Sequence, residues 1–344
     1  MVRPLVLLAL LLAPWALAAS PVATLVSLEG DVTVVRNGQL FASEKVVEGF
    51  PIEGFDTVST GATGKAEVRF VSATGLTGSL RLDPATSLYL DLSSLRDQQT
   101  AGVELLTGAV SVRLSALTGA SGVEVRTELG TFGGAGRGFR VVVAPAGDVF
   151  VSASDGKVPC RVDGRTVFIE PGSAAEVLFL EHSMRTFRVN TSTLASAEAS
   201  WTAQRRQGFR DRAAAYFKAV AGRYQLELGR FQRARDRTQR DTDEAGAPGS
   251  VANLRRAAFP LERSLYRVAA LKQLLDEGVL DPAAELNRGY SAKDFFRQAG
   301  QDQDTWGRLA QARALYRQQA DLHGGEFPKA SEGLDITYTS AFFH

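Results

Sequence analysis

The sequence predicts two domains, an all-β domain followed by an α-helical domain, and two observations carry this prediction. Short apolar or alternating runs separated by glycine fill the first half of the chain, which is typical of strands and turns. From about Asn190 glycine thins out and apolar residues recur every three or four positions, which is typical of helices. We therefore expect a signal peptide at residues 1–18, an all-β domain at 19–189 and an α-helical domain at 190–344.

The first residues contain the three parts of a secretory signal peptide. Arg3 supplies a short basic region, residues 5–12 an apolar core, and Ala16-Leu17-Ala18 a cleavage site with small residues. The apolar stretch is shorter than the roughly 20 residues that a membrane-spanning helix needs, and no later segment approaches that length. We expect cleavage after Ala18, a periplasmic or secreted protein, and no transmembrane segment in the mature chain.

The charge balance and the single cysteine limit the partners. The chain has 39 Lys and Arg against 38 Asp and Glu, a formal net charge of +1, so we expect no nucleic-acid partner.

Cys160 cannot form an internal disulfide, and it lies too far from the cleavage site to accept a lipid. Because it sits between Val158 and Val162 on an alternating run, we expect a buried thiol.

Turn signals divide the β half into many short strands. Asn37-Gly38 is the dipeptide preferred in two-residue hairpin loops, so we expect a hairpin there. From Val123 to Glu128 apolar or small residues alternate with charged ones, which predicts one buried and one solvent-exposed face. Closely spaced turns without intervening helices favour a sandwich, a barrel or a solenoid over β-α-β units.

The helical half begins with one long predicted helix, which ends at the glycine- and proline-containing run 245–250. Its apolar face comprises Phe209, Ala213, Phe217, Val220, Tyr224, Leu228 and Phe231.

Three further helices are expected after that run. The second spans Leu254 to Leu275, with Pro260 in its first turn or at a kink, and Gly278 ends it. A third begins near Asp281 or Ser291. A fourth begins at about Asp304, and the last stretch, 334–344, is a short strand or a loose tail.

Arginines crowd the polar face of the long predicted helix, and this stripe is the most suggestive binding surface in the sequence. It could bind an anionic envelope polymer, lipid headgroups or an acidic partner. Neighbouring acids also allow the alternative of a solvated, ion-paired helix face. The candidate residues are Arg223, Arg230, Arg233, Arg237 and Arg240.

No cluster in the sequence predicts a catalytic, cofactor or metal site. The three histidines lack a partner at metal-ligand spacing, and no nucleophile motif is present. The glycine-rich run 130–138 joins two predicted strands and is therefore interpreted as turns, not as a phosphate loop. A hydrolase using Glu67 with Asp83 or Asp91 as a carboxylate pair is kept as an alternative.

An ordered series of strand and turn segments resembles the FecR periplasmic domain, over about residues 22–177. The resemblance implies an all-β module with a twisted, solenoid-like or sandwich-like sheet, followed here by an α-helical bundle or hairpin. The segments are 28–34, 58–70, 80–90, 105–112, 123–127 with 137–141, and 151–158.

The resemblance to the family also implies part of a mode of action, namely contact with an envelope protein in the periplasm. In its signalling members the domain lies in the periplasm, is contacted by a TonB-dependent outer-membrane transporter, and relays that contact to a sigma-factor regulator. This chain differs, because it has a cleavable signal instead of the cytoplasmic regulator and Phe139 where the family usually has threonine. We therefore do not expect this chain to regulate a sigma factor.

These observations lead to three hypotheses. In the first, the protein is a non-enzymatic, exported interaction or scaffold module whose sheet surface or edge accepts an envelope protein. In the second, the arginine stripe binds an anionic polymer or surface. The third is an uncharacterised hydrolase.

Overall fold

The structure is a computed structural model. It describes residues 21–36, 39–91, 100–115, 122–134, 136–242 and 248–276, together with 278, 281, 283, 285–287 and 289–301. The predicted signal peptide, the predicted fourth helix from Asp304 and the last stretch, 334–344, lie outside the described residues.

The first half of the chain is built of short strands, in the order β1 to β17. Those before the long strand β9 are β1 (Ala23–Glu29), β2 (Val32–Arg36), β3 (Gln39–Phe41), β4 (Pro51–Ile52), β5 (Thr57–Thr60), β6 (Lys65–Phe70), β7 (Gly78–Leu82) and β8 (Ser87–Asp91). From β9 onward they are β9 (Thr100–Leu114), β10 (Gly122–Arg126), β11 (Thr131–Gly133), β12 (Gly138–Val143), β13 (Val149–Asp155), β14 (Val158–Val162), β15 (Arg165–Ile169), β16 (Ser173–Leu178) and β17 (Ser183–Arg188).

The strands form two hydrogen-bonded sets that share β9. One set has the order β4-β1-β6-β7-β9-β12-β13-β16-β17. The other has the order β3-β2-β5-β8-β9-β10-β11-β14-β15. Among the described pairings all are antiparallel except β9 with β10. Apolar residues of both sets belong to one core cluster, which includes Val58 and Leu88 of one set and Val68 and Leu80 of the other.

Strand β9 passes from one set to the other at Gly108. Its first part pairs with β8 and β10, and its second part pairs with β7 and β12. Gly108 has φ +83°, and a Cβ at this position would lie 2.3 Å from Thr86 Oγ1. The Thr86 hydroxyl makes two contacts with Ala109, the residue after Gly108. It accepts from the Ala109 N–H at 2.9 Å and lies 3.2 Å from the Ala109 carbonyl. The crossing therefore needs a residue without a side chain at 108.

Alternation along the strands places the core as the sequence predicts. Val123 and Val125 are buried, whereas Glu124 and Arg126 are partly exposed. Cys160 on β14 is fully buried, and burial raises the pKa of its thiol to about 12. The predicted buried thiol is therefore confirmed.

The predicted hairpin at Asn37-Gly38 is supported by its two strands. Strands β2 and β3 pair antiparallel, with Arg36 opposite Gln39, while the two loop residues lie outside the described part of the chain. A second two-residue hairpin joins β14 to β15 through Asp163 and Gly164, which both have positive φ.

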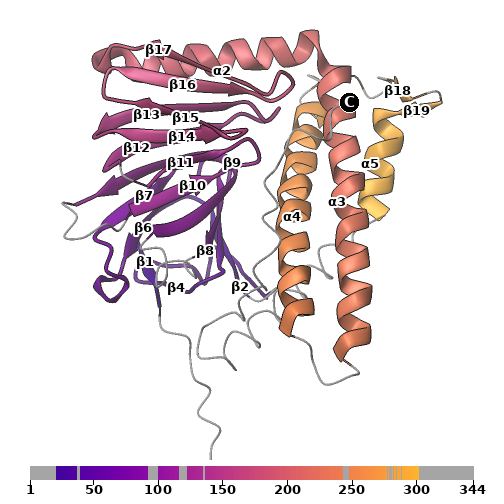
Figure 1. Cartoon of the computed structure of the whole chain (residues 1–344), viewed down its shortest axis with the longest axis horizontal. Helices are drawn as coiled ribbons and strands as arrows, with labels where there is room; N and C mark the ends of the chain where they lie inside the picture. Colours follow the sequence, from indigo (N-terminus) through magenta and orange to yellow (C-terminus); the bar gives the residue numbers. More distant parts are fainter. Residues whose placement is uncertain are drawn as a thin grey trace, which may run out of the picture.

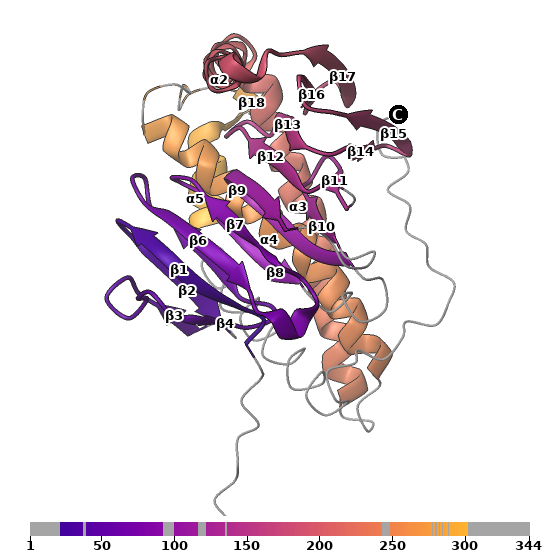
Figure 2. The same cartoon turned by 90° about the vertical axis from the view of Figure 1, so that its left-hand side faces the viewer.

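The second half contains the helices α2 (Leu194–Asp211), α3 (Ala213–Thr242), α4 (Pro248–Asp276) and α5 (Ala292–Gln301). Helices α3 and α4 lie side by side along the stack of strands, and α2 crosses the end of the stack next to β16 and β17 (Figure 1). From the side, α3 and α4 lie behind the strands (Figure 2). A short strand pair, β18 (Glu285–Asn287) and β19 (Tyr290–Ser291), precedes α5.

The prediction of one long helix through Phe209 and Ala213 was wrong. The helix ends at Asp211 and a new one begins at Ala213, because Arg212 has a non-helical backbone with φ −129° and ψ 24°. The two helices pack on different surfaces. Trp201 of α2 is buried against a cluster on β12, β13 and β16, whereas α3 packs chiefly on α4. The direction of each helix is set by the surface on which it packs, and the chain changes from one direction to the other at Arg212.

The other helix limits follow local signals. Pro260 lies inside α4, so the first-turn alternative is wrong. The third helix starts after Ser291, as one of the two predicted starts requires. Ser291 Oγ accepts from the Asp294 N–H at 3.3 Å, and the Asp294 carboxylate accepts from the Ser291 N–H at 3.0 Å.

The predicted layout of strands followed by helices is confirmed. The last strand of the first half, β17, ends at Arg188, and Asn190 Oδ1 accepts from the Ser192 N–H at 3.0 Å where the helical part begins. One core cluster runs through strand and helix residues, among them Val141 and Leu261. The division into two domains stays a prediction. Among the described helices, none is both long and apolar enough to cross a membrane.

The β9 crossing gives a stability prediction. Gly108→Ala should destabilise the protein by about 3 kcal/mol, because it adds a left-handed backbone penalty to a clash with Thr86. Gly164→Ala is the matched control, since Gly164 has φ +75° but no atom within 4 Å of the place where a Cβ would lie. It should cost about 1 kcal/mol. Urea unfolding of both variants checks the difference, and equal losses would contradict the role of the crossing.

Candidate interaction surfaces

The predicted arginine stripe lies on α3, and the structure divides it into two parts. Arg223 Nε lies 3.0 Å from Glu227 Oε1, and Arg230 Nη1 lies 3.1 Å from the same oxygen. The Glu227 side chain is fully buried, so it needs these cations as counter-ions. Arg223 and Arg230 therefore stabilise the helix itself.

The remaining three arginines of the stripe are exposed. Arg233, Arg237 and Arg240 follow one another at steps of four and three residues, which places them on one face of α3. Arg240 Nε donates to the Asp236 carbonyl at 3.2 Å. This smaller surface, which we call the distal arginine face, is the part of the predicted site that a partner can reach.

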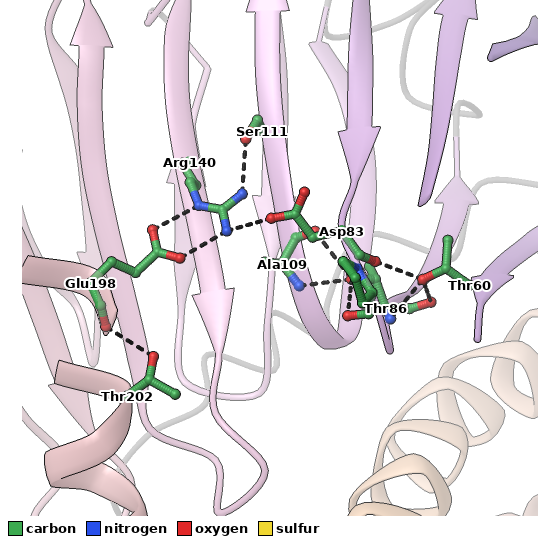
Figure 3. Close-up of polar contacts among 9 residues, drawn as sticks. Thr60, Asp83, Thr86, Ala109, Ser111, Arg140, Glu198 and Thr202 are labelled. Atoms are coloured by element: carbon green, nitrogen blue, oxygen red, sulfur yellow. Dashed lines mark hydrogen bonds and ion pairs between the residues drawn. The ribbon is translucent and has the colours of Figure 1, made fainter. Parts of the chain in front are cut away.

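Helix α2 is fastened to the strands by Arg140 on β12 (Figure 3). The guanidinium donates to both carboxylate oxygens of Glu198 on α2, at 2.7 and 2.8 Å. It also lies 2.6 Å from the carboxylate of Asp83 and donates to Ser111 Oγ at 3.1 Å. Burial lowers the pKa of Arg140, but Glu198 and Asp83 outweigh this, so its pKa lies above the ordinary value.

The turn that carries Asp83 is itself held in place by threonines. Thr60 Oγ1 donates to the Asp83 carbonyl at 2.6 Å and accepts from the Thr86 N–H at 2.9 Å. Thr86 in turn bonds Ala109 beside the β9 crossing (Figure 3). The anchor of α2 is therefore continuous with the crossing of β9.

A second anchor of α2 is Trp201. Its indole Nε1 donates to Glu176 Oε2 at 2.7 Å, and its ring lies 5.4 Å from that of Phe150, centroid to centroid. Glu176 is almost fully buried and is also paired with Arg185. The indole therefore combines apolar burial with a hydrogen bond to a buried carboxylate.

Helices α3 and α4 meet the strands at a polar seam, which comprises Asp148, Tyr216, Arg263, Arg267, Glu104 and Glu128. Asp148, in the turn between β12 and β13, is fully buried and accepts from the Phe179 N–H at 2.8 Å and from the Tyr216 hydroxyl at 3.2 Å. Burial raises the pKa of Asp148, against the Phe179 N–H, Arg205 and Tyr216, which lower it. Burial and the neighbouring Asp148 raise the pKa of Tyr216 to about 12.

Two arginines of α4 complete the seam. Arg267 Nη1 donates to the Ala144 and Pro145 carbonyls at 2.8 and 3.0 Å, and Arg263 Nη1 donates to the Thr127 carbonyl at 2.9 Å. Burial lowers the pKa of Arg267, although Glu128 and Asp148 oppose this. These long side chains bond turns that no apolar side chain could satisfy.

A small pocket lies beside the seam, with a volume of about 60 Å³. This holds a few water molecules and is well below the roughly 300 Å³ of a small ligand site. Its lining comes from the β12–β13 turn, α2 and α4: Ala144, Pro145, Ala146, Thr202, Arg205, Arg206, Phe209 and Leu274.

Strand β15 is the last strand of its set and, among the described residues, an open edge. Among the described residues β14 is the sole strand that pairs with it. Phe168 on β15 is 54% exposed, and the Lys157 ammonium lies 4.7 Å from the centre of its ring. A strand that is paired on one side and has a large exposed apolar side chain can accept a further strand on its other side.

Two further exposed apolar residues lie near the other end of the strand sets. Leu40 on β3 is 60% exposed, and Val47, in the segment between β3 and β4, is 58% exposed. Arg36, the last residue of the neighbouring strand β2, donates to both carboxylate oxygens of Asp56, at 3.0 and 3.1 Å from Nε.

The residues of the carboxylate pair in the hydrolase alternative have other roles in the structure. Asp83 is bound to Arg140, and Glu67 lies 3.8 Å from Arg69. The side chain of Asp91 is outside the described part. Within that part no group of three or more His, Cys, Asp or Glu side chains is arranged to hold a metal ion.

Comparison with known proteins gives few relatives. No protein-family model and no curated protein matches the chain. Two crystal structures, each titled a "putative anti-sigma factor" from Parabacteroides distasonis ATCC 8503, are similar to it at 15% identity and a TM-score of 0.35. The match covers 40% of this chain and 62% of that protein, less than two thirds of its length. Membership of the FecR family stays a prediction from the residues.

The anchors were missed by the sequence analysis. Arg140 and Glu198 are separated by 58 positions, and Tyr216 and Asp148 by 68. Neither pair has a local spacing that indicates contact. The one available signal is an arginine on the otherwise apolar strand β12, because a charge on such a strand needs a partner.

The Arg140 anchor can be tested by stability. Arg140→Ala should cost about 2–3 kcal/mol, because Glu198 and Asp83 lose a partly buried counter-ion. Arg137→Ala is the control, since its ion pair with Asp155 is exposed and should contribute less than about 1 kcal/mol. Urea unfolding followed by far-UV circular dichroism measures both, and a loss for Arg140→Ala no larger than the control would contradict the anchor.

Proposed function

We propose that this chain is an exported, non-enzymatic FecR-domain protein that acts as an interaction or scaffold module in the periplasm or cell envelope. The observation that supports this best is the open edge of β15 with the exposed Phe168. The finer fold we assign is the solenoid-like or sandwich-like FecR module with a helical hairpin. The partner is an envelope protein that supplies an extended segment.

Strand addition fits the chemistry of this edge. The backbone of an edge strand has unused N–H and C=O groups, which give affinity, while side chains beside it give specificity. On β15 Thr166 and Phe168 are exposed, whereas Ile169 is buried. An added strand would therefore gain backbone hydrogen bonds and cover the Phe168 ring.

Site-specific photo-crosslinking in intact cells tests this proposal. A photoreactive phenylalanine analogue at Phe168 should capture one envelope protein, identified by mass spectrometry. Strand pairing also predicts strong capture at 166 and 168 and weak capture at 167, because alternate side chains lie on opposite faces.

Arg69 is the matched control position, because it is exposed on β6, which has a strand on each side. Equal capture from 69 and 168, or none from β15, would overturn docking at this edge.

The distal arginine face supports a second candidate function, the binding of an anionic polymer or surface. Its three arginines are exposed, whereas Arg223 and Arg230 are committed to Glu227. Each arginine near an anionic surface contributes about 1 kcal/mol, so three together give roughly 100-fold in affinity.

Binding to vesicles with anionic lipid and to a soluble polyanion tests this candidate. Substitution of Arg233, Arg237 and Arg240 by glutamine should reduce affinity by about 100-fold and flatten its salt dependence. The control replaces three exposed strand arginines, Arg113, Arg165 and Arg188, in the same way. An equal loss in the control would show a general charge effect and would reject the distal arginine face.

A further inference from the structure

All three long helices converge on one buried carboxylate. Asp148 accepts from Tyr216 of α3. The charge of Arg205 on α2 lowers the pKa of Asp148, and the charge of Asp148 raises the pKa of Arg267 on α4. The Phe179 N–H, from the end of β16, holds the same carboxylate at 2.8 Å. We propose that Asp148 is a latch that fastens α3 and α4 to the strands and that tightens when its carboxyl is protonated.

When the latch opens, α3 and α4 move away from the strands, and the hinge for this movement lies at Arg212. This residue has a non-helical backbone between α2 and α3, and its guanidinium is paired with Glu181 and lies 5.4 Å from the centre of the Tyr216 ring. Helix α2 has anchors of its own, at Arg140 and Trp201. In the proposed movement the pair α3–α4 swings about Arg212 while α2 stays on the strands.

Not all buried polar atoms of the polar seam have hydrogen-bond partners. The contact between the helices α3 and α4 and the strands should therefore open at this seam. Among the described residues, Glu104 Oε2 and Arg267 Nε are buried without a hydrogen-bond partner. Glu104 Oε2 lies 3.6 Å from Arg263 Nη1, and Arg267 Nε lies 3.9 Å from Glu128 Oε2. Buried polar atoms without hydrogen bonds disfavour the closed state relative to one in which water reaches them.

The direction of the pH response follows from linkage. In the closed state burial raises the pKa of Asp148 above the ordinary 3.8, while an opened, hydrated Asp148 returns towards that value. The closed state therefore holds the proton more strongly. Closing is favoured at acid pH and weakens as pH rises from about 3.8 through the raised pKa, by up to tenfold per pH unit.

The other charges at the latch do not reverse this direction. Glu181, on the turn between β16 and β17, raises the pKa further, while Arg205 and Tyr216 lower it by less than burial raises it. Arg212 is paired with Glu181, and Arg267 faces Glu128 as well as Asp148. Arginines keep their charge over this range, so the arginines at the latch do not contribute to the pH response.

Distance measurement between two spin labels tests the latch in the folded, full-length chain. Labels at Thr166→Cys on β15 and Gln225→Cys on α3 occupy exposed positions, and the buried Cys160 stays unlabelled. From about pH 4 to about pH 8 the parent chain should gain a population with a changed distance. Asp148→Asn, which keeps the acceptor for the Phe179 N–H but cannot ionise, should stay closed throughout.

Two further variants separate the latch from a general effect. Asp155→Asn removes an exposed carboxylate and should respond to pH as the parent does. Tyr216→Phe removes one hydrogen bond to Asp148 and should raise the open population at every pH. A distance distribution that is independent of pH in the parent chain, or a pH response that persists in Asp148→Asn with its far-UV circular dichroism unchanged, overturns the proposal.

Discussion

The crossing of β9 at Gly108 is the constraint on which the rest of the structure depends. Because one strand belongs to both hydrogen-bonded sets, the two sets have a fixed register relative to each other. The Thr86 hydroxyl fixes the crossing from one side. The turn before Thr86 carries Asp83, which meets Arg140 and through it α2. The position of α2 is therefore set by the crossing of a strand that lies much earlier in the chain.

Helices and strands are joined in two different ways. At α2 the contact is partly apolar, with Trp201 in a cluster that includes Phe150, and the charges of its two anchors are paired. At α3 and α4 the contact near the turns is mainly polar, and arginines donate to carbonyls at the ends of strands. Polar contacts of this kind fix an orientation well but add less stability than apolar burial of equal area.

Local patterns predicted the strands well, since inward and outward alternation at Val123 and Val125 depends on neighbouring residues alone. They failed where the outcome depends on distant packing. The periodicity from Phe209 to Phe217 is continuous, yet the helix breaks at Arg212 because its two halves pack on different surfaces. The arginine stripe was predicted as a whole, but burial of Glu227, which depends on the tertiary fold, takes Arg223 and Arg230 from it. The pairing of Asp148 with Tyr216 had no local signal at all.

The burial of Cys160 has a consequence for how the chain can be followed experimentally. A thiol with a pKa of about 12 is ionised in roughly one molecule in 10⁵ at neutral pH, and its strand shields it from reagents. Alkylation must wait until β14 separates from its neighbours, so the rate of modification reports how often this part of the sheet opens. The alkylation rate of Cys160 therefore reports how often the sheet opens near the end of its strand set, on the strand next to β15.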